Sequence, residues 1–346
     1  VGNPPYVPIE FISEQEKVLF KAQYPCLERK YDTSVVFILH SLDLLQKNGL
    51  LSFISSVTWQ TGKNYKELRG VLLKDYSIKE IVNLPFDVFK DAYVDTCIYI
   101  IGGEDTSDNG YDIFSYDKKD RVSNLEGINF ERVSYDTSLE NEDNSIILNP
   151  RAYELKTRTE KSLKIEKLGN ISDSTQGLAK NKFPFKDMPF DGSYPFLFEA
   201  EIKRYKLEPQ VIKYTYLNDK KSLERFYQSE PKILIRRLIS RQDRVLCSYT
   251  DKNYVFSKDT NPFILHRQED TLYTLAVLNS RLLSYLYVNL SSIATKDDFR
   301  QTTLAEIRDL PIAVPSASQK LIVSKLAEEI LNAESALEVS KSTFNK

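Results

Sequence analysis

The segment Asn3-Pro4-Pro5-Tyr6 constrains the fold of this chain more than any other. Both prolines fix φ and lack a backbone N–H, so neither extends a helix or a central strand. Proline also restricts the residue before it to extended geometry, which affects Asn3 and Pro4. The sequence therefore predicts a rigid loop that holds backbone carbonyls and the Asn3 amide oxygen as acceptors in fixed positions. These acceptors suit an amino group on a flat ring, and Tyr6 offers a face for that ring to stack on.

Apolar spacing after this loop predicts alternating helices and strands. Thr33 or Ser34 is placed to cap a helix that ends at Asn48-Gly49, and a second helix is expected over residues 64–74. Strands are expected over residues 50–55, 77–83, 94–101 and 111–116. Alternation of this kind favours an α/β sheet covered by helices.

The second part of the chain is more aromatic and has a mixed pattern. Strands are expected over residues 212–217, 232–238 and 253–256, a short extended piece over 310–315, and a helix over 271–290. A last helix starts at Ser318, with one apolar stripe formed by Ile322, Leu326, Ile330, Ala333 and Leu337. A polar loop precedes Asn149-Pro150, so we predict domains over 1–148 and 149–315, followed by a C-terminal helix over 316–346.

Charge divides the chain in a similar way. The net charge is −2, but residues 1–150 carry −9 and residues 151–346 carry +7. A change of sign between halves indicates two domains, the second of which faces a polyanion. The alternative is an uneven surface charge that serves no partner.

Composition argues against several classes of protein. The longest apolar runs, such as residues 97–101, are far too short to span a bilayer, so no membrane partner is expected. Three widely spaced cysteines point to a reducing cytoplasm and not to a disulfide framework. With two histidines and no Cys-x-x-Cys pair, no metal site is expected.

Several motifs together resemble one family. The opening loop, the following helix and residues 50–59 resemble the catalytic half of adenine-specific DNA methyltransferases of the Taq or gamma class, which include the fused type IIG restriction-modification enzymes. The resemblance continues through residues 87–96 and covers about residues 1–103. It implies an incomplete Rossmann-like methyltransferase sheet, followed by an α/β target-recognition domain and the C-terminal helix.

The second part contains motifs that are individually less specific, but their order matches that of a known kind of domain. Residues 167–171 and 175–178 resemble the start of a target-recognition domain, and residues 202–205, 231–237 and 275–280 follow in the order of such domains. Leu310-Pro311-Ile312, Gln319 and the last helix are similar to the segment after these domains in type I specificity subunits. The resemblance implies double-stranded DNA as the partner.

The resemblance also implies a catalytic site at Asn3, Pro4, Pro5 and Tyr6. The Asn3 oxygen and the Pro4 carbonyl would accept both amino hydrogens of adenine and free its lone pair for a methyl group, without a covalent enzyme intermediate. The base must leave the duplex, with Tyr6 stacked on one face and Phe89 packed from another side. Without the resemblance, Phe89 would be read as a core aromatic beside a strand.

A basic run supplies the candidate DNA contacts. Arg236, Arg237, Arg241 and Arg244 lie within nine residues and suit phosphates or the guanine edge. In a strand Arg236 and Arg237 point to opposite faces, so at most one is expected to reach a base. The alternative is a charged turn between strands. Lys203 and Arg204 are a weaker pair of phosphate-contact candidates.

The implied cofactor is S-adenosylmethionine, yet its usual binding motif is missing. Such a site needs a strand that ends in a glycine-rich turn, then an acidic residue for a ribose. Gly102-Gly103 ends an expected strand but opens an acidic loop. We therefore expect a fragment that lacks the donor-binding half, does not methylate DNA alone, and belongs with a donor-binding region and a nuclease domain outside this sequence.

Three other functions stay open at this point. The chain is also readable as a DNA specificity module without catalysis, or as a methyltransferase for RNA or protein glutamine, since these enzymes share an Asn-Pro-Pro-Tyr loop. Pro189-x-Asp191 followed by Glu201-x-Lys203 loosely resembles a metal-nuclease pattern. The basic second part, together with motifs in the order of a target-recognition domain, favours DNA over RNA or protein.

Overall fold

A computed structural model covers the chain and describes residues 1–85, 88–89, 94–103, 109–117, 120, 122, 124–141, 143–217, 225–239, 244–291 and 300–344. The described residues form two compact units, which divide between Glu154 and Leu155. Both units mix helices and strands, so the predicted α/β class is confirmed.

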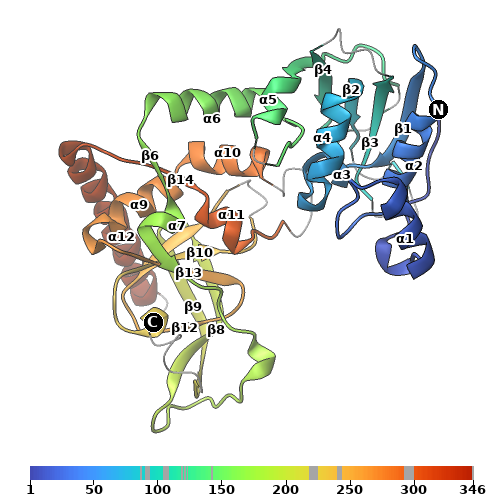
Figure 1. Cartoon of the computed structure of the whole chain (residues 1–346). Helices are drawn as coiled ribbons and strands as arrows, with labels where there is room; N and C mark the ends of the chain where they lie inside the picture. Colours follow the sequence, from blue (N-terminus) through green and yellow to red (C-terminus); the bar gives the residue numbers. More distant parts are fainter. Residues whose placement is uncertain are drawn as a thin grey trace. The chain divides into compact units, whose positions relative to one another are not determined.

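The first unit is built on one five-stranded sheet with helices beside it (Figure 1). Its strands are β1 (Leu50–Ser56), β2 (Ser77–Asn83), β3 (Thr96–Gly102), β4 (Gly110–Ser115) and β5 (Glu131–Ser134). Its helices are η1 (Ile9–Phe11), α1 (Glu14–Gln23), α2 (Thr33–Asp43), α3 (Thr58–Thr61), η2 (Lys63–Tyr65), α4 (Lys66–Lys74) and α5 (Tyr135–Leu139). These elements confirm the strands and helices predicted before residue 117, with shifts at their ends. The predicted helix end at Asn48-Gly49 is wrong, because α2 ends at Asp43.

The order of the strands places the opening loop at the sheet. The order is β1-β3-β2-β4-β5, in which β2 and β4 are parallel and the other neighbours are antiparallel. Gly2 pairs in parallel with Phe53 of β1: its N–H donates to Ser52 O at 3.0 Å, and the Ile54 N–H donates to Gly2 O at 3.0 Å. The loop Asn3–Tyr6 therefore starts from a backbone that is already held along β1.

Helix α2 begins at Thr33, so its N-cap lies one residue before the predicted cap Thr33. Asp32 is the N-cap, and its carboxylate accepts from the Ser34 N–H at 2.8 Å, a bond that satisfies one of the unpaired donors of the first turn. Val35, Ile38 and Leu42 are buried as the spacing predicts, and they pack in the core of the first unit.

The second unit contains three small sheets. Its strands are β6 (Ile165–Lys167), β7 (Ser172–Ser174), β8 (Tyr194–Lys203), β9 (Lys206–Thr215), β10 (Lys232–Arg236), β11 (Cys247–Thr250), β12 (Val255–Phe256), β13 (Thr260–Leu265) and β14 (Pro311–Ala313). They pair in the orders β11-β10-β13-β7, β12-β8-β9 and β14-β6. Helices are α7 (Leu168–Ile171), η3 (Lys180–Lys182), η4 (Gln268–Asp270), α9 (Thr271–Leu278), α10 (Arg281–Leu290), α11 (Leu304–Arg308) and α12 (Ala317–Phe344).

Strands β8 and β9 form a hairpin whose turn is Arg204-Tyr205, where Tyr205 has φ 61°. Close backbone packing holds the segment before this hairpin. A Cβ added to Gly177 would lie 2.0 Å from Ser257 O, so only glycine fits there. The next residue, Leu178, donates its N–H to Phe256 O at 2.8 Å, which ties this segment to β12.

The helix predicted over residues 271–290 is wrong as one element, because it breaks into α9 and α10. Ser280 caps α10 by accepting from the Leu283 N–H at 3.1 Å. The Asn279 side chain bonds both the N–H and the carbonyl of Cys247, at 3.1 and 3.0 Å. Two polar side chains inside an apolar run thus end one helix and start the next.

Helix α12 confirms the predicted last helix, but its packed face differs from the apolar stripe. Val323, Ala327 and Leu331 pack against the core of the second unit. Ile322 and Leu326 of the stripe are 60% and 54% exposed. Within the described part of the chain, no helix is long and apolar enough to cross a membrane.

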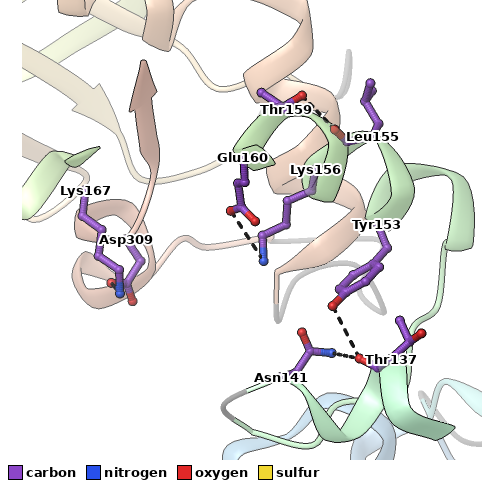
Figure 2. A network of polar contacts seen from close by, with 9 residues as sticks. All are labelled: Thr137, Asn141, Tyr153, Leu155, Lys156, Thr159, Glu160, Lys167 and Asp309. Carbon is purple, nitrogen blue, oxygen red and sulfur yellow. Dashed lines mark hydrogen bonds and ion pairs between the residues drawn. The ribbon is translucent and has the colours of Figure 1, made fainter. Parts of the chain in front are cut away.

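The boundary between the two units falls within helix α6 (Pro150–Ser162), between Glu154 and Leu155 (Figure 2). On the first-unit side, Tyr153 donates its hydroxyl to Thr137 O at 3.4 Å. On the second-unit side, Thr159 Oγ1 donates to Leu155 O at 2.7 Å, and Lys156 lies 3.9 Å from Glu160. The predicted domain limits at residues 148 and 315 stay predictions.

Candidate functional site

Thr33 joins the opening loop to the start of α2 through three hydrogen bonds. Its hydroxyl donates to Pro5 O at 2.6 Å and accepts from the Val7 N–H at 3.0 Å. Its own N–H donates to Val7 O at 3.0 Å. Sequence reasoning considered Thr33 only as a helix cap, and its contact with Pro5 depends on a fold that brings residues 28 positions apart together.

Tyr6 links the loop to β1. Its hydroxyl lies 2.5 Å from Asn3 Oδ1 and 2.9 Å from Ile54 O, so its one proton serves either acceptor. Tyr6 is half-buried, and burial, then the Cys97 thiol and the Asp32 carboxylate, raise the pKa of its phenol. The ring is therefore a neutral donor at physiological pH, anchored at its hydroxyl.

Two acceptors lie next to each other in this loop. Asn3 is exposed, with its amide oxygen beside the Tyr6 hydroxyl, and Pro4 is buried. Among the hydrogen bonds of the described residues, none ends on the Pro4 carbonyl. The pair suits a group that offers two N–H donors.

Aromatic side chains hold the segment of β1 that faces the loop. The rings of Phe53 and Trp59 both meet the Tyr99 ring edge to face, with centroids 6.4 and 5.3 Å apart. Trp59 and Tyr99 are 1% and 0% exposed, so this packing is part of the core. It gives the loop a rigid support.

Arg69 fixes the turn after β1, and sequence reasoning missed it. The side chain is wholly buried, and its guanidinium donates to four carbonyls, those of Trp59, Gly62, Asp143 and Asn144, at 2.6–3.1 Å. Burial lowers the pKa of Arg69 to about 10, which leaves it charged at neutral pH. Its partners are 7 to 75 positions away, so no local pattern reveals them.

Phe89 is half-buried and adjoins segments outside the described residues. Its packing against a base stays a prediction. Arg241, one of the predicted DNA contacts, lies outside the described residues.

The other predicted DNA contacts fall into two electrostatic settings. Burial, and then the positive charges of Arg204 and Arg281, lower the pKa of Arg244, so Arg244 feels the charge of two further arginines. Like charges held together are stabilised by a polyanion. Arg281, at the start of α10, escaped sequence reasoning because the cluster draws on three separate segments.

Lys203, by contrast, is neutralised within the hairpin. Its Nζ lies 2.7 Å from Glu208 and 3.3 Å from Glu201, and Lys206 lies 2.6 Å from Glu208. Hydrogen bonds from the two lysines lower the pKa of Glu208 to about 2. Lys203 therefore shares its charge with carboxylates of its own hairpin, including Glu201 of the metal-nuclease-like pattern.

Arg236 and Arg237, at the end of β10, have different surroundings. Arg236 lines a groove of about 560 Å³ in the second unit. The Arg237 backbone donates to Asp259 O at 2.9 Å and accepts from the Thr302 N–H at 2.8 Å.

The described residues contain neither a metal site nor a methyl-donor site of the Rossmann kind. No group of three or more His, Cys, Asp or Glu in them is placed to hold a metal ion. No glycine-rich turn joins a strand to a helix in the same residues, so they do not fit a donor site of the Rossmann kind.

Family comparisons agree with this division of the chain. Residues 1–89 match the Eco57I restriction-modification methylase family, and residues 194–312 match the TaqI-like C-terminal specificity domain. The chain joins a restriction-modification methylase region to a TaqI-like specificity domain. The resemblance predicted from the loop and from the motif order is thereby confirmed.

Curated relatives extend the similarity over most of the chain. A putative type II restriction enzyme and methyltransferase of Methanocaldococcus jannaschii is 34% identical over 339 residues, which are 95% of this chain and 28% of that protein. The type II restriction enzyme and methyltransferase Eco57I of Escherichia coli is 24% identical over 66% of this chain and 23% of its own length. The chain spans less than a third of the curated relatives it matches.

Solved structures share the fold at low sequence identity. The type IIL restriction-modification enzyme MmeI, solved in complex with DNA, has a TM-score of 0.61 at 13% identity over 97% of this chain and 49% of its own. A nuclease-deletion mutant of the type ISP enzyme LlaGI, bound to a DNA substrate mimic, has a TM-score of 0.55 at 13% identity over 96% and 41%.

Proposed function

We propose that this chain provides the acceptor side and the DNA-recognition unit of an adenine-N6 DNA methyltransferase of a restriction-modification system. The observation that carries the proposal is the pair of acceptors at Asn3 and Pro4 beside the anchored ring of Tyr6. The family of the two regions supports a methyltransferase with a specificity domain.

The acceptor pair acts on the amino group of the target adenine. Its lone pair is delocalised into the ring, so the nitrogen is a weak nucleophile. When Asn3 Oδ1 and Pro4 O each accept one amino hydrogen, the nitrogen becomes pyramidal and its lone pair turns out of the ring plane. S-adenosylmethionine supplies the methyl group in this class of reaction. The chain contributes position and electrostatics, with Thr33 holding the loop in register.

The target adenine reaches the loop only after it leaves the duplex. Extrusion costs a few kcal/mol, and stacking on an aromatic ring returns about 1–3 kcal/mol. In this proposal Tyr6 stacks on one face of the base and Phe89 packs from another side. The Tyr6 hydroxyl bond to β1 holds the ring in place before the base arrives.

Double-stranded DNA is the proposed partner of the second unit. Arg204, Arg244 and Arg281 supply positive charge for phosphates in this proposal. Arg237, Arg241 and Lys203 are further proposed contacts, of which Lys203 contributes least because it is paired with Glu201 and Glu208. We further propose that the protein works in the cytoplasm, in line with its free cysteines, and together with a donor-binding region and a nuclease. The names of the relatives combine restriction and methylation in the same way.

Mass spectrometry of nucleosides tests the reaction. Duplex DNA is incubated with S-adenosylmethionine and the complete gene product that contains this chain, then digested. We expect N6-methyladenine, a loss of at least about a hundredfold in Asn3→Ala, and no product from residues 1–346 alone. Methylcytosine as the only product, or methylation of RNA or glutamine in preference to DNA, contradicts the proposal.

A DNA specificity module without catalysis is the second candidate. The absence of a glycine-rich donor turn from the described residues favours it for the chain by itself. Site-specific DNA binding by residues 1–346, combined with a complete gene product that transfers no methyl group, supports this candidate over the first.

A further inference from the structure

One groove of the second unit collects polar side chains from several strands. It has a volume of about 560 Å³, and its walls include Glu199 and Glu201 of β8, Gln210 of β9, Arg236 of β10, and Gln301. Asp259 and Lys180 complete its charged groups. All of these residues belong to the second unit, so the groove is complete within it.

Two of the charged groups have no partner among the residues that the structure describes. Counting only the described residues, neither the Arg236 guanidinium nor the Glu199 carboxylate makes a hydrogen bond or an ion pair. Lys180 lies 4.6 Å above the Phe198 ring, and Glu201 is paired with Lys203 at 3.3 Å. Arg236 and Glu199 are therefore left for a ligand.

The backbone aims both side chains from fixed positions. Arg236 closes β10, where its N–H donates to Leu246 O at 3.0 Å and its Cα pairs with Thr260 of β13. Glu199 lies at an irregularity of the β8–β9 ladder, with register shifts on both of its sides. Bulges of this kind turn a side chain away from its regular direction and are common beside binding sites.

The mixture of charges distinguishes this groove from a site for phosphates alone. A groove for phosphates carries positive charge throughout, as the Arg204, Arg244 and Arg281 cluster does. Here carboxylates, amides and a guanidinium line one groove. Base edges in the major groove of DNA offer donors and acceptors in the same mixture: guanine presents two acceptors, and cytosine presents an amino donor.

We propose that this groove reads base edges, with Arg236 donating to O6 and N7 of a guanine and Glu199 accepting from the amino group of a cytosine. The inference rests on the proposed function, since it requires duplex DNA as the partner. Of the two adjacent arginines, Arg236 lines the groove and reads a base in this proposal, and Arg237 is assigned to the DNA backbone. Glu199 becomes a specificity-determining residue that sequence reasoning had not singled out.

Selection of bound duplexes from a randomised pool, followed by sequencing, tests this assignment on the 346-residue chain. A glutamine is matched to adenine N6 and N7. We therefore expect Arg236→Gln to lose about tenfold of the preference for guanine at one position, with adenine gaining there. Glu199→Gln should change a different position, from cytosine to adenine. The remaining positions should keep their preferences.

Arg29→Gln, an exposed residue of the first unit, is the matched control for charge and should leave all positions unchanged. Circular dichroism and the affinity for a non-specific duplex confirm that each variant is folded. Unchanged preferences in both groove variants, or an equal loss at all positions together with non-specific affinity, overturn the inference and leave DNA binding intact. A lack of any enrichment by the unaltered chain contradicts the proposed function itself.

Discussion

Arg69 of the first unit and Arg236 of the second show how one residue type serves two purposes. Arg69 is wholly buried and donates to four carbonyls from two segments, residues 59–62 and 143–144. Arg236 is half-buried, lines a groove, and has no partner in the described part of the chain. The first arginine holds the turn after β1, and the second is available to a ligand.

The lysines repeat this contrast within one unit. Lys232 is 0% exposed, and its Nζ donates to the carbonyls of Gln228, Glu230 and Lys252 at 2.6, 3.1 and 3.0 Å. Lys203 is exposed and shares two carboxylates. The positive net charge of residues 151–346 is therefore not all available to DNA, because part of it is fixed inside the fold.

Removal of Arg69 is expected to have the largest effect on stability. Arg69→Met removes the guanidinium donor from four carbonyls, of which that of Gly62 keeps a second bond, from the Tyr65 N–H, so the free energy of unfolding of the first unit should fall by about 3–5 kcal/mol. Urea denaturation followed by fluorescence of Trp59, the only tryptophan, measures it. Arg29→Met, at an exposed position, should cost less than about 0.5 kcal/mol. An equal loss of unfolding free energy in the two variants would show that the buried Arg69 stabilises the fold no more than an exposed arginine does.

Lys232 should give a smaller loss, with a characteristic pH dependence. Lys232→Met removes the donor to three carbonyls, at a cost of about 1–3 kcal/mol at pH 7. Burial lowers the pKa of Lys232 to about 8, below the roughly 10.4 of an unfolded lysine. Between these values the unfolded state binds more protons, so this group makes the second unit more stable as pH rises from 8 to 10.

Hydrogen exchange of the β10 amides, corrected for intrinsic rates at each pH, measures this change. The difference in stability between the native chain and Lys232→Met should grow from pH 8 to pH 10 if deprotonation relieves the buried charge. A difference that stays constant over that range would show that Lys232 keeps an ordinary pKa.

Arg244 should affect DNA binding with little effect on folding. Arg244→Ala removes one charge from a cluster of three, so the dependence of log affinity on log salt should lose about one unit of slope. Filter binding between low and physiological salt measures the slope. Lys325→Ala, at an exposed position of α12, is the control and should leave it unchanged. A slope that Arg244→Ala does not alter would remove the cluster from the DNA interface.

Lys203 is expected to give the smallest effect. Its charge is shared with Glu201 and Glu208, so Lys203→Ala should reduce the salt slope by only a fraction of one unit. The same filter-binding series measures it beside Arg244→Ala. If Lys203→Ala matches or exceeds the Arg244 variant, the internal ion pairs do not limit its role at DNA.

Local chemistry explains what the sequence predicts well. The rigid loop at Asn3–Tyr6 follows from the backbone limits of two prolines, and the elements of the first unit follow from apolar spacing. The break at Asn279-Ser280 was missed although a Ser cap is a local signal, since the apolar run around it dominated the pattern.

Contacts between distant segments explain what the sequence does not predict. The Thr33 clamp on Pro5, the Arg69 carbonyl set and the Arg281 cluster each join residues that only the fold brings together. The exposed stripe of α12 is a related case, because apolar spacing shows that a helix has a packing face but not which neighbour covers it.

Photocrosslinking tests the central claim most directly, namely that the Asn3–Tyr6 loop receives a base extruded from DNA. A duplex selected by the chain is made with 5-iodouracil in place of the target adenine, irradiated in the complex, and the adduct is mapped by mass spectrometry. We predict an adduct on Tyr6, lost in Tyr6→Leu while DNA binding is retained. An adduct confined to other residues, or none on Tyr6 when the chain is saturated with DNA, would contradict the claim.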